Sequence, residues 1–138
     1  MKKFLCAACL TLFFACNSWA LDASKVSVDV LAKTVHSWDG NTLSNYPEGQ
    51  PEVTILKISI PPKTKLPLHQ HPVINAGVLL KGELTVETND NKILHLKAGD
   101  PIVEVMNTWH FGENTGNEVA EIIVFYAGIK DKPITIKK

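Results

Sequence analysis

The sequence predicts an all-β protein built as one domain, an antiparallel sandwich or barrel. The chain has 138 residues, enough for one hydrophobic core and too few for a second. After Pro51, short β-branched apolar runs alternate with Gly, Pro and Asn residues, which is the pattern of closely spaced strands and turns. No stretch after Pro51 keeps the 3.6-residue period of an amphipathic helix, so we expect strands to build the domain.

Residues 1–20 have the features of a secretory signal peptide. Lys2 and Lys3 give a positive start, residues 4–16 carry no charge, and residues 18–20 place Ser and Ala where signal peptidase reads small side chains. The apolar run is about 13 residues long, whereas a membrane anchor needs ~20. A lipid on Cys16 is a third possibility, but the residues before it lack the usual Leu. We expect cleavage after Ala20, a periplasmic or secreted protein, and no membrane contact after signal removal.

The inventory of side chains narrows the possible chemistry. Cleavage after Ala20 would remove Cys6, Cys9 and Cys16, which are all the cysteines of the chain. The mature protein would then have no disulfide and no thiolate, so a metal would need imidazole, amide or carboxylate ligands. The 14 basic residues are all Lys and balance 14 acidic residues, so no basic, Arg-bearing surface for nucleic acid is expected.

Two regions are expected after the signal peptide, an N-terminal extension at residues 21–50 and a barrel at residues 51–138. In the extension, residues 26–38 fit one or two edge strands or a short helix, and Asp39-Gly40-Asn41 predicts a turn. Leu84 and Val86 alternate with polar residues and should face the core. The strands predicted in the barrel are Val53–Ile60, Gly82–Thr88, Ile93–Lys97, Ile102–Met106 and Glu121–Tyr126.

The segment LHQHP at residues 68–72 carries the clearest chemical signal. In an extended chain His69 and His71 point to the same side, about 7 Å apart, so both can approach one ion. Neutral imidazole is the commonest metal ligand in proteins. Taken alone, the pair fits two exposed histidines equally well, and the rest of the chain must decide between the two interpretations.

Residues 63–82 and 99–114 resemble the two signature motifs of the cupin superfamily. Each motif is defined by Gly, His and a few other residues at fixed spacings along the chain. The positions that match are His69, His71 and Gly82 in the first motif, and Gly99, His110 and Asn114 in the second. The positions that depart are Lys63 for Gly and Asn75 for Glu in the first motif, and Val105 for Pro and Asn107 for Gly in the second.

The resemblance implies a cupin or jelly-roll β-barrel in which His69, His71 and His110 bind one divalent transition metal ion (Fe, Mn, Ni, Cu or Zn). It also implies a homodimer and a small-molecule ligand. Asn75 is then either a weak fourth ligand through its amide oxygen or a residue that faces the ion through water. A centre with three neutral imidazoles keeps the positive charge of the ion and should favour an anionic ligand.

The departures and the neighbouring residues carry further expectations. Asn107 should tolerate the positive φ of the Gly it replaces, and Lys63 should be accommodated by a backbone adjustment. His95 should point to solvent, and His36 carries no clear role. Trp109 and Phe111 flank His110 and should pack in the core, and either Phe125 or Tyr126 faces the interior. Glu83, Glu87 and Glu104 fall on polar or mixed faces, and nothing in the sequence pairs them as acid and base.

Three functions remain open because cupins include enzymes and non-catalytic binders. The first is a metalloenzyme, oxygenase-like or isomerase-like, acting on a small anionic molecule. The second is a periplasmic module that binds or senses a metal or a small ligand without turnover. The third is a metal-free barrel whose main property is dimerisation. An enzyme should place a polar or ionisable side chain in the pocket besides the metal ligands, whereas a binder can have apolar walls only.

Overall fold

The computed structural model describes residues 25–138 and confirms an all-β antiparallel fold. The predicted signal peptide and the expected mature start at Leu21 lie outside these residues. The strands, numbered in chain order, are β1 (Pro51–Ile60), β2 (Thr64–Lys65), β3 (His69–Gln70), β4 (Ile74–Lys81), β5 (Glu83–Thr88), β6 (Ile93–Lys97), β7 (Pro101–Val103), β8 (His110–Asn114), β9 (Ala120–Ile129) and β10 (Ile136–Lys137).

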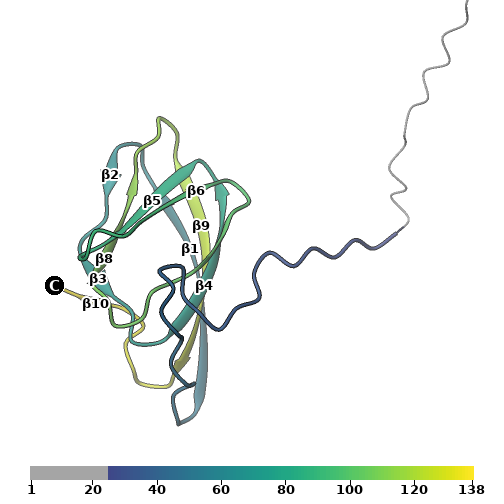
Figure 1. Ribbon diagram of the computed structural model, residues 1–138, viewed down its shortest axis with the longest axis vertical. Coiled ribbons are helices and arrows are strands. Elements are labelled where there is room, and N and C mark those ends of the chain that lie inside the picture. Colours follow the sequence, from purple (N-terminus) through teal and green to yellow (C-terminus); the bar gives the residue numbers. More distant parts are fainter. Residues whose placement is uncertain (1–24) are drawn as a thin grey trace, which may run out of the picture.

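The strands form two sheets that face each other around one interior (Figure 1). One sheet has the order β1-β9-β4-β7, and the other has the order β10-β3-β8-β5-β6 with β2 also paired to β8. All of these strand pairs are antiparallel. The second sheet carries the histidines, since β3 and β8 are neighbours in it.

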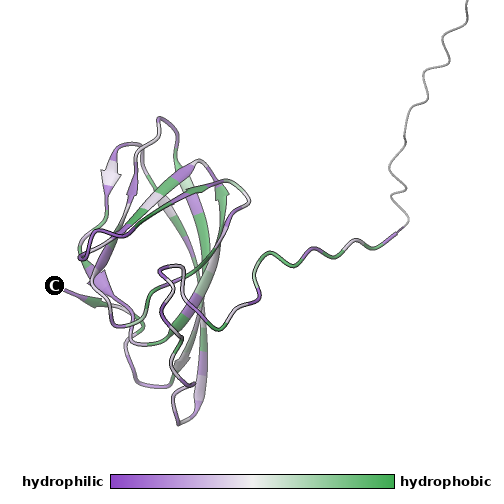
Figure 2. Cartoon of the chain, in the orientation of Figure 1, coloured by the Kyte–Doolittle hydropathy of each residue, from purple (hydrophilic) through white to green (hydrophobic). Residues whose placement is uncertain are grey.

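The core lies between the sheets and follows the two-residue alternation of the strands. Leu84 and Val86 of β5 are buried as predicted, and Ile122 and Val124 of β9 face them from the other sheet. Figure 2 shows apolar residues interspersed with polar ones along these strands. Tyr126 is also buried, whereas the neighbouring Phe125 is exposed, so the tyrosine is the residue of that pair that enters the interior.

The predicted strands agree with the structure best where alternation is regular. Ile93–Lys97 coincides with β6, and Val53–Ile60 and Glu121–Tyr126 lie within β1 and β9. The run Ile102–Met106 is longer than the strand it predicted, because β7 ends at Val103. β4 was not predicted from the sequence, because Asn75 and Gly77 interrupt its apolar residues.

The N-terminal extension differs from the expectation for residues 26–38. The structure shows neither a strand nor a helix there, only an isolated bridge between His36 and Thr42. The turn at residues 39–41 is present, with Ser37 N donating to Asn41 O at 2.9 Å and Gly40 at a φ of 90°. Trp38 N donates to Val103 O at 2.9 Å, which attaches the extension to the barrel beside β7. The described residues that precede this contact, beginning at residue 25, run away from the barrel (Figure 1).

The four glycine positions of the cupin motifs all have positive φ in this chain. Gly82 and Gly99 have φ values of 74° and 96°, and Lys63 and Asn107, which replace glycines, have 57° and 51°. Asn107 thus behaves as expected, because Asn is among the side chains that best tolerate this region. Lys63 does not adjust its backbone and instead keeps the left-handed conformation. A Cβ at Gly82 would in addition lie 2.9 Å from Val119 O, so this turn requires glycine.

Asn114, the last residue of the second motif, has a structural role. Its fully buried side chain donates through Nδ2 to Ile60 O at 2.9 Å and to Glu118 O at 2.7 Å. Its Oδ1 accepts from Gly116 N at 3.0 Å. The amide therefore joins β1, β8 and the turn before β9, where unpaired backbone groups would otherwise be buried.

The aromatic residues beside His110 do not join the core. Phe111 points outward and is half-buried under Lys65, whose Nζ lies 3.5 Å from the ring centroid. Trp109 is likewise half-buried and is not part of the core cluster. Since His110 points inward, its neighbours on an extended strand must point outward, and the expectation of core packing was wrong. Within the described part of the chain, no helix has the length and hydrophobicity to cross a lipid bilayer.

Candidate metal centre

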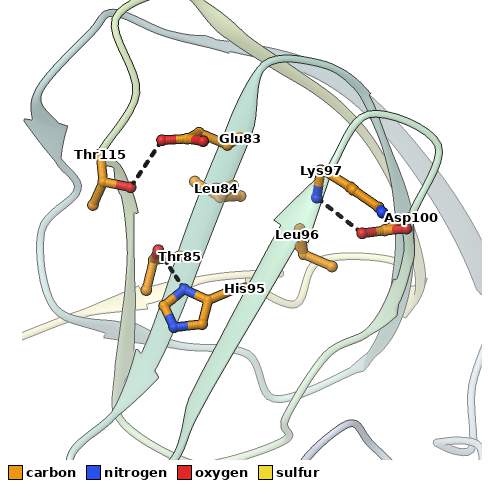
Figure 3. Close-up of a pocket in the computed structure, with 8 residues that line it drawn as sticks. All are labelled: Glu83, Leu84, Thr85, His95, Leu96, Lys97, Asp100 and Thr115. Carbon is orange, nitrogen blue, oxygen red and sulfur yellow. Dashed lines mark hydrogen bonds between the residues drawn. The ribbon is translucent and has the colours of Figure 1, made fainter.

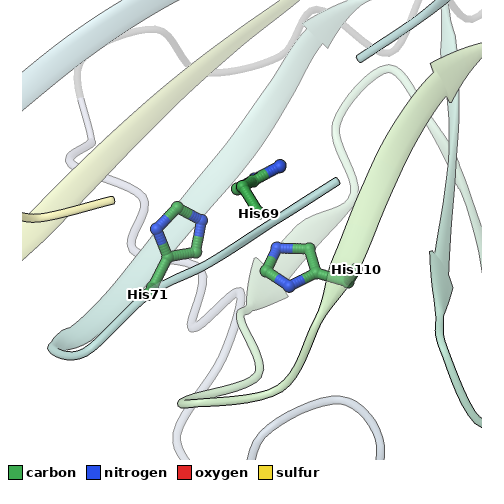
Figure 4. Close-up of side chains that lie close together, drawn as sticks. All are labelled: His69, His71 and His110. Atoms are coloured by element: carbon green, nitrogen blue, oxygen red, sulfur yellow. The ribbon is translucent and has the colours of Figure 1, made fainter. Parts of the chain in front are cut away.

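Two neighbouring strands and the residue after one of them bring three imidazoles together. His69 begins β3 and pairs directly with His110, which begins β8. His71 follows β3 and forms a bridge with Met106. The three ring centroids lie between 4.5 and 5.1 Å apart, and one nitrogen from each ring lies within 4.8 Å of the others. Figure 4 shows the rings gathered around one space.

Backbone carbonyls set the orientation of all three rings. The Nδ1 atoms of His69, His71 and His110 lie 2.7, 2.9 and 2.8 Å from the carbonyl oxygens of residues 67, 134 and 108. A carbonyl oxygen can only accept, so each Nδ1 carries the proton and each Nε2 keeps a free lone pair. His110 Nε2 is buried without a hydrogen-bond partner. A buried lone pair of this kind is costly unless a ligand such as a metal ion binds it.

Burial keeps the imidazoles uncharged. The pKa of His71 falls to about 4, chiefly because burial disfavours the cation, and the hydrogen bond to the Ile134 carbonyl only partly opposes this. Burial also lowers the pKa of His69 and of His110. All three side chains are therefore neutral near pH 7, the form in which imidazole binds metal ions.

Glu104 is the functional candidate that the sequence analysis did not find. Its side chain is only 13% exposed, and its Oε1 lies 3.7 Å from His110 Nε2. Trp38 Nε1, from the N-terminal extension, donates to the same oxygen at 3.3 Å. Burial raises the pKa of the Glu104 carboxyl to about 7, and the Trp38 hydrogen bond lowers it only in part. Its position two residues after Ile102 was the one indication in the sequence, because residues two apart on a strand point to the same face and Ile102 is buried.

Asn75 of β4 lies between Glu104 on one side and Tyr126 of β9 on the other. Asn75 pairs with Tyr126 of β9, and its carbonyl accepts from Glu104 N at 3.1 Å. The amide is 2% exposed, and neither its Oδ1 nor its Nδ2 has a hydrogen-bond partner. Such an amide fits a site that holds an ion or water, because buried amides otherwise find partners. Whether Asn75 binds the metal stays a prediction.

Tyr126 adds a hydroxyl to the same pocket. Its ring contacts that of His71 edge to face, with 5.4 Å between centroids. Burial, helped by the Glu104 charge, raises the pKa of the phenol to about 12, so the hydroxyl keeps its proton near neutral pH. The pocket thus has a group that can donate a hydrogen bond to a ligand.

Two hollows lie beside the histidines and share lining residues. The inner cavity, of about 60 Å³, is lined by the three imidazoles, Glu104 and Tyr126 among apolar side chains. An outer hollow of about 320 Å³ shares His69, His71 and Tyr126 with it and is bordered by Lys137. Lys137 pairs with His69 across β10 and β3, so its ammonium group stands at the mouth.

A larger hollow of about 450 Å³ lies elsewhere, on the outer face of β5 and β6 (Figure 3). His95 lines it and is exposed, as predicted, with Nδ1 3.0 Å from Thr85 Oγ1. The polar residues here hydrogen-bond one another, as in the pair Lys97 N and Asp100 Oδ2 at 2.9 Å. One imidazole in an open surface does not make a metal site. His36 is also exposed, in the extension.

The donor set in the inner cavity fits a divalent transition metal. Three neutral imidazoles suit Fe, Ni, Cu and Zn, and an adjacent carboxylate also suits Mn. His69, His71 and His110 can hold the ion, and the carbonyls behind them fix their orientation as in many metalloproteins.

Comparison with known proteins agrees with this fold. The family model of the cupin domain matches residues 56–126, just over half of the chain. No curated protein sequence matches the chain. Among solved structures, an uncharacterized conserved protein with a double-stranded β-helix domain from Klebsiella pneumoniae is similar, with a TM-score of 0.54 and 20% identity over 69% of this chain and 87% of that one.

Two further similar structures are enzymes much longer than this chain. The DMSP lyase DddQ from Ruegeria pomeroyi has a TM-score of 0.55 at 17% identity, covering 72% of this chain and 47% of that one. The oxalate decarboxylase of Bacillus subtilis, described with Mn(II) centres, has a TM-score of 0.53 at 20% identity, covering 62% and 23%. This chain spans less than half of the first and less than a quarter of the second, and the likeness concerns the fold. With its two facing sheets, its three converging histidines and the matched domain, the chain belongs to the cupin family.

Proposed function

We propose that this protein is an exported cupin metalloenzyme, oxygenase-like or isomerase-like, that acts on a small anionic molecule. The observation that carries the proposal is the set of three neutral imidazoles whose Nδ1 atoms bind carbonyls and whose Nε2 atoms face one cavity. When bound there, a divalent ion would supply positive charge to polarise a substrate oxygen.

The charges around the pocket support an anionic substrate. The histidines contribute no negative charge, and Lys137 stands at the mouth opposite His69. An anion entering the outer hollow would pass a cation and then reach the metal site. Oxalate, named for one of the similar structures, is a small dianion of this chemical class and gives a first compound to test.

The pocket also favours an enzyme over a simple binder. Tyr126 and Glu104 are polar side chains in the inner cavity besides the three histidines, as the enzyme hypothesis requires. The Tyr126 hydroxyl can donate to a substrate oxygen, and the Glu104 carboxyl can hold or accept a proton. The small volume of the inner cavity, about 60 Å³, supports the alternative of a non-catalytic binding or sensing module, because it leaves little room beyond the ion.

The proposal is tested by the metal content of the protein purified from its native compartment. We expect about one equivalent of a divalent transition metal by elemental analysis, and loss of nearly all of it in His71→Ala, because a buried ligand is removed. His95→Ala is the matched control and should keep its metal, since His95 lies on the outer face. A wild-type protein without metal, or equal loss in both variants, would contradict the proposal.

Turnover separates the enzyme from the binder. The metal-loaded protein is incubated with small carboxylates, beginning with oxalate, and both product formation and binding are followed. Turnover that is lost in His71→Ala supports the enzyme. Saturable binding with no product for any compound supports the binding module instead.

A further inference from the structure

We infer that Glu104 supplies a carboxylate ligand to the metal ion. It would thereby replace the glutamate of the cupin motif, at whose position this chain has Asn75. The inference rests on the proposed metal site and adds one residue to it. The sequence motifs place a carboxylate at position 75, where this chain has an amide. The structure instead places a carboxylate one strand to the side.

The backbone puts Glu104 directly beside Asn75. In the β4–β7 ladder, Ala76 lies opposite Val103, and the next step brings residue 104 opposite residue 75. The hydrogen bond from Glu104 N to Asn75 O, 3.1 Å long, continues the ladder by that step. Directly opposed residues of an antiparallel pair point to the same face. Both side chains therefore enter the barrel side by side, from neighbouring strands.

The distance between Glu104 and His110 suits a shared ion. Glu104 Oε1 lies 3.7 Å from His110 Nε2, and the two atoms are not hydrogen-bonded to each other. Two atoms that bind one ion at ~2.1 Å each are at most ~4.2 Å apart, so the separation allows a common ion. One ion could therefore be shared by His110 at the start of β8 and by Glu104, the residue that follows β7.

Trp38 holds the carboxylate in this position. The indole N–H can only donate, and it lies 3.3 Å from Oε1. No Lys side chain pairs with Glu104 in the described part of the chain. A buried carboxylate without a Lys partner is costly, and a divalent ion would compensate it. The centre would then keep about one net positive charge, which still favours an anionic substrate.

The experiment measures Co²⁺ binding to metal-free protein, by competition with a chromophoric chelator and by the visible absorption of the bound ion. Glu104→Gln keeps the shape of the side chain and removes its charge. We expect the dissociation constant for Co²⁺ to rise roughly 100-fold, at the upper end of what the loss of a supporting carboxylate causes. The absorption bands should also shift, because a ligand is lost. Glu87→Gln, on the outer face of β5, is the matched control and should change neither measurement.

The double variant Asn75→Glu/Glu104→Gln moves the carboxylate to the neighbouring strand. We expect it to restore affinity to within about tenfold of wild type, which a mere loss of folding could not produce. Two outcomes overturn the inference. One is Glu104→Gln binding Co²⁺ within threefold of wild type with unchanged bands, and the other is a double variant as weak as the single one. A wild-type protein that binds no Co²⁺ would instead overturn the proposed metal site itself.

Discussion

At the scale of single residues, the interior of this barrel is controlled by a few buried polar side chains whose protonation depends on one another. His71 and His110 are 4% and 1% exposed, and burial disfavours their cations. Burial disfavours the anion of Glu104 in the same way. A metal ion would stabilise the neutral imidazoles and the carboxylate together. Without metal, the two kinds of group make opposite contributions to stability as the pH changes.

The metal-free protein should therefore respond to acid in a way that depends on Glu104. The pKa of His71 falls from 6.5 to about 4 on folding, so the unfolded chain binds more protons in this range and the free energy of unfolding falls as the pH drops below 6.5. The pKa of Glu104 rises from 4.5 to about 7, so the folded protein binds the extra proton and the free energy of unfolding rises as the pH drops from 7 to 4.5. The two effects partly cancel.

Glu104→Gln removes the opposing effect. We expect the variant to lose roughly 2 kcal/mol more unfolding free energy than wild type between pH 7.5 and pH 5. Urea unfolding of both metal-free proteins at the two pH values measures this difference. If both proteins lose the same amount, Glu104 is already ionised in the metal-free protein and its burial does not control its pKa.

Some residues of the site could be predicted from the sequence, and others could not. His69, His71 and His110 could be found from the sequence, because their spacing is local and matches a known motif. Glu104 could not, because its place beside Asn75 depends on the register between β4 and β7, which no local pattern encodes. Trp38 reaches the site from an extension without regular strands, so alternation gave no indication of its role.

At the scale of elements, the metal site depends on how the loop before β8 is attached to the residues after β3. Asn107 N donates to His71 O at 2.9 Å, and Asn107 itself has a φ of 51°. This bond and the bridge between His71 and Met106 fix His71 relative to the segment that leads into His110. The left-handed turn was predictable because it occupies a glycine position of the motif. The strand boundaries were less predictable from the sequence. The strands β2, β3 and β10 have only two residues each, and their extended conformation depends on pairing with a neighbouring strand.

Substitutions at Asn107 should separate backbone strain from side-chain chemistry. Asn107→Gly should leave the free energy of unfolding within about 0.5 kcal/mol, because glycine adopts this φ freely. Asn107→Val should lower it by roughly 2 kcal/mol, because a β-branched residue is strained there. We also expect weaker Co²⁺ binding in the Val variant alone. Denaturant unfolding and Co²⁺ titration test both points, and equal stability of the two variants would argue against a required left-handed turn.

At the scale of the whole molecule, the two sheets differ in what their outer faces expose. The outer face of the β1-β9-β4-β7 sheet carries Val53, Ile55 and Phe125, which are 69%, 59% and 48% exposed. Ile55 and Phe125 are direct cross-strand partners, so they form one continuous patch. On the other sheet, Phe111 is covered by Lys65, and Ile93 is a large apolar residue left exposed on the same face, at 53%. An exposed apolar patch on a regular sheet is typical of an interface, and the expected homodimer would use this face.

The dimer prediction can be tested by one substitution made on each sheet. We expect the wild-type protein to sediment as a dimer at micromolar concentration and Phe125→Glu to sediment as a monomer, because two carboxylates would be buried in the interface. Phe111→Glu is the matched control, since it places the same charge on the outer face of the other sheet, beside Lys65, and should remain dimeric. Circular dichroism of all three proteins checks that the fold is kept. A monomeric wild type, or a dimer that survives Phe125→Glu, would mean that this face stays open to solvent. The three histidines open away from it, toward β10, so metal binding should be the same in the monomer and the dimer.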